Sequence, residues 1–462
     1  MTLRPLDWGF SQGADGGLVI GGAHAAALAD EFGTPLHVVD EAGLRRRAAG
    51  FRAAFEAAYP GPVAVHYAMK CNNTPGIVRL VFDAGVLPEV GTPYEWCLAR
   101  RMCMPPEAII VNGPNKGDLL RTAIAEGAGL IVLDGPQELE VAEAIAREAG
   151  QEARVLVRVN PNVVPKGMNR ASATGSRTRS VFGFDLVSGE VAAALSRLAA
   201  SRWLRFAGLH CHVGTGIRRT RDYEGPLELV LACAAQAERL GLKVEMLDVG
   251  GGFGVSTSRE LDTLEFLTYQ AAGRLPPAPR PERFPTAAEF AAAVAGAVVK
   301  GCARHGLALP RLVVEPGRAI LSSAVVLLVR VGAVKHRSGV GTWVITDGAA
   351  GTVAFPLFYE YHEVLLCRAP AAPRTERYTI VGPVCFSADW IYRNKRMPET
   401  QPGDVLAVCD AGAYFTVQES NFGFPRPAIV AVEGGVPRVL RRRETFDDMV
   451  CRDSGWERPD EQ

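Results

Sequence analysis

The chain has 462 residues, more than one ordinary hydrophobic core accommodates, so two domains are expected. Lysine plus arginine and aspartate plus glutamate number 50 each, and this balance gives no electrostatic case for a nucleic-acid or membrane partner. No apolar run is long enough to span a bilayer, the amino terminus lacks a signal peptide's apolar core, and ten scattered cysteines form no CxxC pair, so a cytoplasmic protein with reduced thiols is expected.

Short β-like runs alternate with helical segments through the middle of the chain. Residues 1–40 hold short strand-like pieces, and a helical pattern begins at about residue 41. Eight β-like runs then follow at Val63–Ala68, Val86–Val90, Ala108–Asn112, Leu130–Asp134, Val155–Asn160, Phe206–Val213, Val244–Val249 and Leu312–Glu315. Alternating strands and helices predict a parallel sheet, and about eight such units predict a (β/α)8 barrel of the α/β class.

The pattern changes after about residue 324. Strand-like runs follow one another without helices, at Val325–Val334, Thr342–Ile345, Tyr378–Val381, Val405–Val408 and Ala428–Val432. We therefore expect a barrel over residues 41–323 and a mostly antiparallel β domain formed by residues 1–40 and 324–462. Two long connections, 161–178 and 256–285, interrupt the barrel pattern, and loops of this length are usually lids, binding loops or disordered inserts.

Polar residues or glycine stand at the end of every predicted barrel strand. They are Lys70, Glu89, Asn112, Asp134, Asn160, His212, Gly250 and Glu315. Chemistry in such barrels takes place at the carboxyl ends of the strands, although a barrel mouth also needs polar residues for solvation. Lys70 either extends to water as a strand-ending lysine or, in a partly desolvated pocket, forms a Schiff base with an aldehyde.

Three clusters near these strand ends favour a cofactor site. The glycines of Asp248-Val-Gly-Gly-Gly-Phe-Gly254 can bring backbone N–H groups to an anion, and Arg318 of Glu315-Pro-Gly-Arg318 can bind the same anion. His210 and His212 point to one face, but no third ligand is apparent beside them, so no metal is predicted and His212 is expected to stack on a cofactor. Together with Lys70, these groups indicate a pyridoxal-phosphate (PLP) site.

Seven motifs, in order, resemble those of the fold-type III PLP-dependent decarboxylases, a family that includes diaminopimelate and ornithine decarboxylases. The motifs are Tyr67-Ala-Met-Lys70, Arg158-Val-Asn-Pro161, His210-Cys-His-Val-Gly-Thr215, Gly250-Gly-Gly-Phe-Gly254, Glu315-Pro-Gly-Arg318, Cys385-Phe-Ser-Ala-Asp389 and Asp410-Ala-Gly-Ala-Tyr414. The resemblance covers nearly the whole chain. It implies an alanine-racemase-like barrel followed by a β domain.

The resemblance also implies roles for individual residues. Lys70 would bind PLP covalently, His212 would stack on its ring, Glu315 would pair with its ring nitrogen, and Cys385 would reprotonate the α carbon. Phosphate binding would involve Gly250, Gly251, Gly252, Gly317, Arg318 and Tyr414, with Thr215 helping. The residues expected near the substrate are Asp347, Phe355, Tyr359, Phe386 and Arg158. The family is dimeric, and its β domain brings the Cys385 loop to the partner's barrel, so a homodimer with shared active sites is expected.

The substrate-recognition motifs depart from the family pattern. Diaminopimelate decarboxylases carry an arginine that clamps the distal carboxylate where this chain has Phe355, and the family has an acidic residue where this chain has Phe386. A buried ammonium without a carboxylate partner would be costly. We therefore expect a substrate other than diaminopimelate, lysine or ornithine, with an apolar, aromatic or carrier-linked side chain, in specialised metabolism. The alternative is that other groups recognise the charge, with Arg218, Arg219 and Arg221 as the candidates.

Two other activities stay open on the same fold, a PLP-dependent racemase or epimerase and a non-catalytic PLP-binding regulatory homologue. Glu315 favours decarboxylation, because a carboxylate keeps the ring nitrogen protonated, whereas the related racemase fold places an arginine there. A non-catalytic homologue should have lost cofactor residues, yet Lys70, Glu315 and Arg318 are all present. The expected protein is a PLP-dependent amino-acid decarboxylase.

Overall fold

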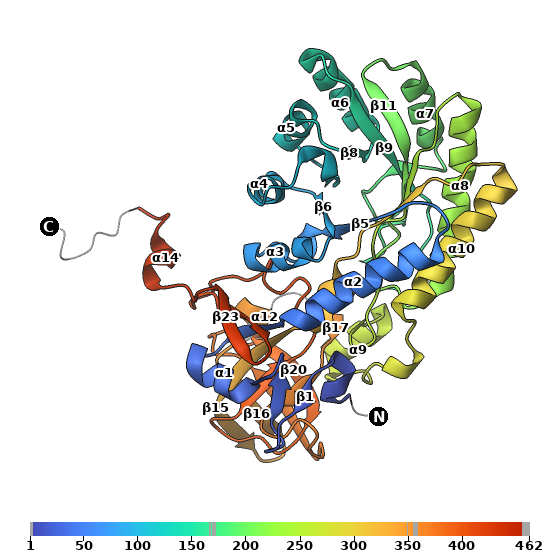
Figure 1. The fold of residues 1–462 in the computed structure, drawn as a ribbon. Helices are drawn as coiled ribbons and strands as arrows, with labels where there is room; N and C mark the ends of the chain where they lie inside the picture. The colour runs from blue at the N-terminus through green and yellow to red at the C-terminus, as the bar shows by residue number, and fades with distance from the viewer. Residues whose placement is uncertain (1–2, 166–167, 169–171, 349, 354–358, 455–462) are drawn as a thin grey trace. The chain divides into compact units, whose positions relative to one another are not determined.

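The computed structural model describes residues 3–165, 168, 172–348, 350–353 and 359–454, and the chain forms two compact units (Figure 1). The barrel unit comprises Met1–Leu3, Gly43–Ala271 and Pro276–Ser323. The β unit comprises Arg4–Ala42, Ala272–Leu275 and Ala324–Gln462.

Eight parallel strands form a closed barrel in the first unit. In chain order they are β5 (Val63–Ala68), β6 (Leu87–Val90), β7 (Ile110–Val111), β8 (Leu130–Leu133), β9 (Ala153–Asn160), β11 (Leu204–His210), β12 (Met246–Asp248) and β14 (Arg311–Val314). Their spatial order is β9-β11-β12-β14-β5-β6-β7-β8, and a further pairing of β8 with β9 closes the ring. The predicted (β/α)8 barrel is confirmed. The short strand β10 (Phe184–Asp185) adds to the edge of β9.

Helices connect the barrel strands and cover their outer face (Figure 1). They are α3 (Pro75–Asp83), α4 (Pro93–Arg101), α5 (Asp118–Glu126), α6 (Pro136–Ala149), α7 (Glu190–Ala200), α8 (Glu224–Arg239) and α10 (Ala287–His305). Because both faces of the strands are covered, the strands read as continuous apolar runs, and small and branched side chains such as Val132, Ala207 and Val313 fill the interior. Because the strands are parallel, this packing holds their carboxyl ends together at one end of the barrel.

One barrel helix is an exception to the expectation that no apolar run is long enough to span a bilayer. Residues Pro281–His305 are long and apolar enough to qualify, by length and composition, as a candidate membrane span. Phe290, Val294 and Val298 on α10 are buried, and α10 packs against α8. The apolar face therefore serves as the contact of a covering helix with the barrel.

The β unit contains a mixed, mostly antiparallel sheet. Its strands are β4 (Leu36–Asp40), β15 (Val325–Arg337), β16 (Gly341–Thr346), β18 (Val364–Leu366), β19 (Glu376–Val381), β20 (Trp390–Met397), β21 (Val405–Val408), β22 (Ala428–Glu433) and β23 (Val436–Arg441). The long strand β15 pairs with β4, β16 and β21. Parallel pairing occurs between β4 and β22 and between β16 and β19.

Candidate active site

Lys70 lies just beyond β5, where its amine faces the mouth of the barrel unit. Its Nζ is 3.2 Å from Oε2 of Glu89, which lies on the neighbouring strand β6. The Lys70 side chain is 52% exposed, whereas that of Glu89 is 3% exposed. Burial raises the pKa of Glu89 to about 7, although Lys70 acts in the opposite direction. An accessible amine is thus held beside a carboxyl group that exchanges a proton near neutral pH.

Glu315 lies at the end of β14, buried within a polar network. Its Oε1 accepts a hydrogen bond from Asn112 Nδ2 at 3.3 Å, and its Oε2 is 3.6 Å from His210 Nε2. Burial raises the pKa of Glu315, but the nearby His210 and Lys70 outweigh it and hold that pKa below the usual range. Burial, followed by the charge of Glu315, raises the pKa of Asp248 well above its usual range. Of the two carboxyl groups, Glu315 is therefore favoured to carry the negative charge and Asp248 to hold a proton.

The buried residues His210, Asp248 and Glu315 also form a possible ligand cluster for a metal ion. Their ligand atoms all lie within 4.8 Å of one another. This set differs from the pair His210 and His212 considered from the sequence, where no third ligand was apparent. The expectation of no metal stays a prediction, and the Glu315 carboxylate is the same group that the PLP assignment uses.

The ring of His212 is fixed by the glycine loop that follows β12. Gly251 N donates a hydrogen bond to His212 Nδ1 at 3.0 Å, so Nδ1 is the acceptor. Burial, followed by the charge of Lys70, lowers the pKa of His212 well below its usual range. The imidazole is therefore neutral and held in one orientation, which suits the predicted stacking on an aromatic cofactor ring.

The glycines at 250–252 are required by their surroundings. Gly250 and Gly252 have φ angles of +65° and +85°. A Cβ on Gly251 would lie 2.3 Å from the Glu315 carbonyl oxygen, and one on Gly252 would lie 2.1 Å from that of Gly214. The N–H groups of Gly250 and Gly251 already donate to Asp248 and His212. The loop thus lets a ligand come close to the backbone. Because two of its N–H groups are already engaged, fewer are left to bind an anion than the three glycines suggest.

The loop after β14 completes the barrel side of the candidate site. A Cβ on Gly317 would lie 2.8 Å from Cys71 Cβ, so this glycine permits close packing beside Lys70. Arg318 begins α11 (Arg318–Leu321) and is buried, while Thr215 is half-buried after β11. Their phosphate-binding roles stay predictions.

Arg158 of β9 is buried and already engaged within the barrel. Its Nη1 donates to Oδ1 of Asp134 at 3.1 Å, and its guanidinium lies 4.3 Å from the centroid of the Phe182 ring. Contact with the substrate, which the sequence predicts for Arg158, would use its remaining donors.

The other predicted site residues belong to the β unit. Cys385 is exposed, Phe386 is 48% exposed, and Tyr359 is half-buried. Asp347 accepts hydrogen bonds from Arg330 N at 2.8 Å and from the Thr34 hydroxyl, so both of its oxygens are used within this unit. Phe355 lies outside the described residues.

Tyr414 has a strained backbone. Its φ of +66° places a bulky side chain in the left-handed region, and Asp410 nearby has a φ of +60°. Such strain persists where the surrounding structure requires a particular side-chain direction, and it is common in ligand-binding segments. The predicted phosphate-binding role of Tyr414 is compatible with this constraint.

Sequence reasoning missed the supporting roles of His210 and Asp248. The predicted sixth and seventh strands extended to Val213 and Val249, whereas β11 ends at His210 and β12 ends at Asp248. Both residues therefore lie at the carboxyl ends of strands. A polar residue at a strand end is the same signal by which the other site residues were predicted.

A family model for the pyridoxal-binding domain of pyridoxal-dependent decarboxylases matches residues 42–322. The chain belongs to this family of fold-type III enzymes, and it is a PLP-dependent decarboxylase.

Particular relatives cover nearly the whole chain. Diaminopimelate decarboxylase of Actinosynnema pretiosum subsp. auranticum is 36% identical over 442 residues, covering 95% of this chain and 93% of the relative. The Bacillus subtilis diaminopimelate decarboxylase is 30% identical, with 96% of each chain covered. The crystal structure of diaminopimelate decarboxylase from M. jannaschii in complex with L-lysine has a TM-score of 0.83 at 26% identity, covering 96% of this chain and 98% of that chain.

These relatives contradict the expectation of a substrate other than diaminopimelate with an apolar, aromatic or carrier-linked side chain. That inference required Phe355 and Phe386 to lie against the substrate. Recognition groups can also come from other loops, so two altered motif positions do not remove charge recognition. The racemase and non-catalytic alternatives are likewise unsupported, because the chain belongs to a decarboxylase family.

The residues at the barrel mouth fit PLP. The barrel unit contains an exposed lysine amine, an ionised buried carboxylate and a neutral imidazole. It also contains a glycine loop in which a side chain larger than that of glycine would clash with the backbone. When bound, PLP supplies an electron-withdrawing ring that stabilises the charge left on the α carbon by loss of CO₂. Lys70, His212, Glu315 and the 250–252 loop are the groups of this chain that would hold it.

Gly252→Ala is expected to weaken PLP binding about tenfold or more, because a methyl group at this left-handed position would push the loop away from Gly214. The dissociation constant can be measured by titrating PLP into the apoprotein and following the absorbance of the bound cofactor. Gly296→Ala is the matched control, since a Cβ there meets nothing within 4 Å. Equal PLP affinity in the two variants would contradict the assignment of the loop to the cofactor.

Proposed function

We propose that this protein decarboxylates diaminopimelate, releasing CO₂ from one α carbon and leaving lysine. The observation that carries the proposal is the 36% identity to a diaminopimelate decarboxylase over 95% of the chain. The complex of a similar enzyme with L-lysine is consistent with it, because lysine is what remains when diaminopimelate loses CO₂.

The chain's residues would divide the work as follows. Lys70 would hold the cofactor, and its amine, which lies beside Glu89, would be placed to move a proton. Glu315 holds a proton at the ring nitrogen, and the neutral His212 keeps the ring in place. Once the carbon–carboxylate bond has broken and CO₂ has left, the Cys385 thiol would donate the proton that forms the new carbon–hydrogen bond at the α carbon.

The proposal is tested by measuring CO₂ release and lysine formation with the PLP-loaded protein. The panel contains meso-diaminopimelate, lysine, ornithine and an aromatic amino acid, each at several concentrations so that kcat/KM is obtained. Diaminopimelate is expected to give the highest kcat/KM, with equal amounts of CO₂ and lysine. Decarboxylation of another member of the panel without turnover of diaminopimelate would overturn the substrate assignment and leave the decarboxylase class intact.

We also propose a homodimer in which the exposed Cys385 of one subunit serves the Lys70 of the other. The inactive variants Lys70→Ala and Cys385→Ala are then expected to complement each other after mixing under subunit-exchanging conditions. Random pairing makes half of the dimers mixed, and each mixed dimer has one intact site, so about a quarter of the wild-type activity should return.

The readout is the rate of CO₂ release, with the dimer checked by light scattering. Each variant incubated alone is the control and should stay inactive. If both variants form dimers and exchange subunits but no activity returns, Cys385 does not act on the partner's site.

A further inference from the structure

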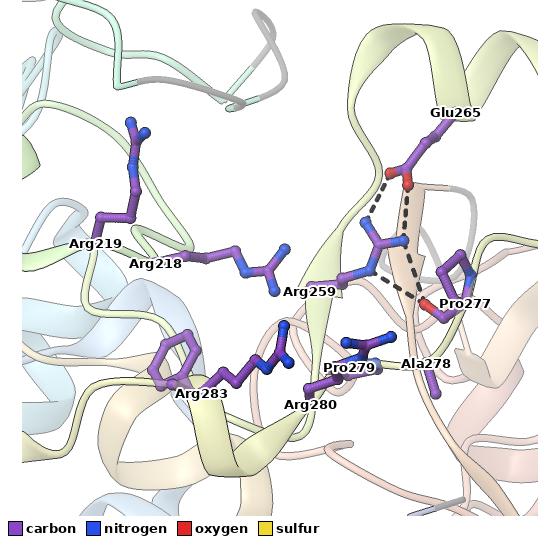
Figure 2. Close-up of a pocket in the computed structure, with 10 residues that line it drawn as sticks. Arg218, Arg219, Arg259, Glu265, Pro277, Ala278, Pro279, Arg280 and Arg283 are labelled. Carbon is purple, nitrogen blue, oxygen red and sulfur yellow. Dashed lines mark hydrogen bonds and ion pairs between the residues drawn. The ribbon is translucent and has the colours of Figure 1, made fainter. Parts of the chain in front are cut away.

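An arginine-rich pocket of about 640 Å³ lies in the barrel unit, beside the loops that follow β11 and β12 (Figure 2). Its lining residues are Arg218, Arg219, Arg259, Glu265, Pro277, Ala278, Pro279, Arg280, Arg283 and Phe284. Five arginines thus face one glutamate. We call this set of residues the arginine pocket.

One arginine forms a fixed wall of the arginine pocket. The side chain of Arg259 is only 9% exposed. It binds both oxygens of Glu265, at 2.7 and 2.8 Å, and also donates to the Pro277 carbonyl oxygen at 3.3 Å (Figure 2). This bidentate pair accounts for Glu265, the acidic group that the described residues supply to the lining, and it anchors the proline-rich segment that carries Arg280 and Arg283.

The other charges are not balanced in the same way. Arg219 pairs with Asp222 at 2.7 Å. The side chains of Arg218, Arg280 and Arg283 have no hydrogen bond or ion pair within the described part of the chain. In Figure 2 the guanidinium groups of Arg218 and Arg283 extend into the same space. Burial, followed by the charge of Arg259, lowers the pKa of Arg218, although Glu265 acts in the opposite direction.

The backbone holds these arginines in position. Ile217, which precedes Arg218, donates to the Gly252 carbonyl oxygen at 2.8 Å and accepts from Gly254 N at 3.1 Å. Phe284 follows Arg283, and its ring lies 5.9 Å from that of the buried Phe290 on α10. A mobile surface cluster would lose much conformational entropy on binding a ligand, whereas anchored loops lose less.

The arginine pocket is separate from the groups assigned to PLP. None of its lining residues is Lys70, His212, Glu315, Arg318 or a glycine of the 250–252 loop. The loop hydrogen bonds of Ile217 do connect the two places through Gly252 and Gly254. The PLP phosphate is assigned to Arg318 and the 250–252 loop, and diaminopimelate, with two ammonium and two carboxylate groups, has no net charge that calls for these arginines.

We propose that the arginine pocket binds a compact anion with at least two negative charges, of the polyphosphate or polycarboxylate class. Guanidinium groups bind phosphate and carboxylate oxygens in the same bidentate manner, so the two sources share their chemistry. Arg218, Arg280 and Arg283, whose side chains bind no other described residue, supply the donors, and the anchored Arg259 and the proline-rich segment shape the wall. This site goes beyond the proposed decarboxylation and does not depend on its substrate.

The test is isothermal titration of the PLP-loaded protein at low ionic strength, with inorganic triphosphate in one arm and citrate in the other. Saturable binding of one anion per chain is expected in at least one arm, and the affinity should fall as salt is added. The double variant Arg218→Gln/Arg283→Gln should bind at least about tenfold more weakly. Binding in only one arm identifies the class of anion.

Arg202→Gln provides the matched control. Arg202 is an exposed arginine that precedes β11, whereas Arg218 follows the same strand, so the two lie toward opposite ends of the barrel. It should bind as the wild type does. Arg280→Gln is a second, single-residue variant in the pocket, and circular dichroism checks the folding of every variant.

Three outcomes would overturn the proposal. They are the absence of binding in both arms, equal affinity of the double variant and the wild type, and an equal loss of affinity in Arg202→Gln. The absorbance of bound PLP is followed during each titration. Release of PLP in step with binding would place the anion in the cofactor site and would also overturn the proposal. Failure of diaminopimelate turnover has no bearing on these readouts.

Discussion

Lys70→Ala is expected to abolish covalent binding of PLP and, with it, decarboxylation. Lys70 is the residue at the end of β5 whose amine is both exposed and held 3.2 Å from Glu89. Alanine has no amine to react with the cofactor aldehyde, so PLP could be held only by the weaker contacts of the glycine loop and the neighbouring side chains. The loss of activity should reach the detection limit of the assay.

The measurement combines absorbance with borohydride reduction and mass spectrometry. The wild type should gain the mass of one reduced cofactor on the peptide containing Lys70, whereas the variant should gain none. Lys300→Ala, an exposed lysine of α10, is the control and should behave as the wild type. Cofactor still attached in Lys70→Ala would assign the linkage to another lysine.

Glu315→Gln is expected to lower kcat about 100-fold or more while leaving PLP bound. Glutamine has the same shape and can still accept a hydrogen bond from Asn112, but it carries no negative charge. The surrounding network holds the pKa of this carboxyl group below its usual range, whereas burial and the charge of Glu315 raise that of Asp248. Without that negative charge nearby, the protonated form of the ring nitrogen is less favourable. The cofactor then withdraws electrons less strongly.

The kinetic readout is the ratio of variant to wild-type kcat at saturating diaminopimelate, with PLP content determined separately. Glu152→Gln, an exposed glutamate in the barrel unit, should leave kcat unchanged. A wild-type kcat in Glu315→Gln with full cofactor would remove Glu315 from the ring nitrogen. Loss of PLP alone would instead indicate a role in cofactor binding.

The barrel could be predicted because its signal is local. Each strand reads as an apolar run bounded by helical segments, and β5, β8 and β14 lie within a residue or so of the predicted runs. β20 and β23 were not predicted. Both strands carry charged residues, and one of these, Lys395, is buried against Glu363 at 2.9 Å, so polarity hid the strand pattern.

The substrate inference failed for a related reason. It treated Phe355 and Phe386 as substitutes for charged groups at fixed places in the site. Whether a side chain faces a substrate depends on its loop and on the residues around it. Motif position alone therefore carries little information about specificity when several loops can supply a recognition group.

The sequence by itself determined the fold class, the cofactor and the residues at the strand ends, because strand periodicity and the placement of polar residues after each strand are properties of short segments. Only the tertiary structure decided which of these groups act together. It brings Lys70 to Glu89, raises the pKa of Asp248 while lowering that of Glu315, and makes His212 Nδ1 an acceptor for the glycine loop. It also gathers Arg218, Arg259, Arg280 and Arg283 into one pocket. Distances and burial between residues far apart in the chain set these relations, and neither is written in a local pattern.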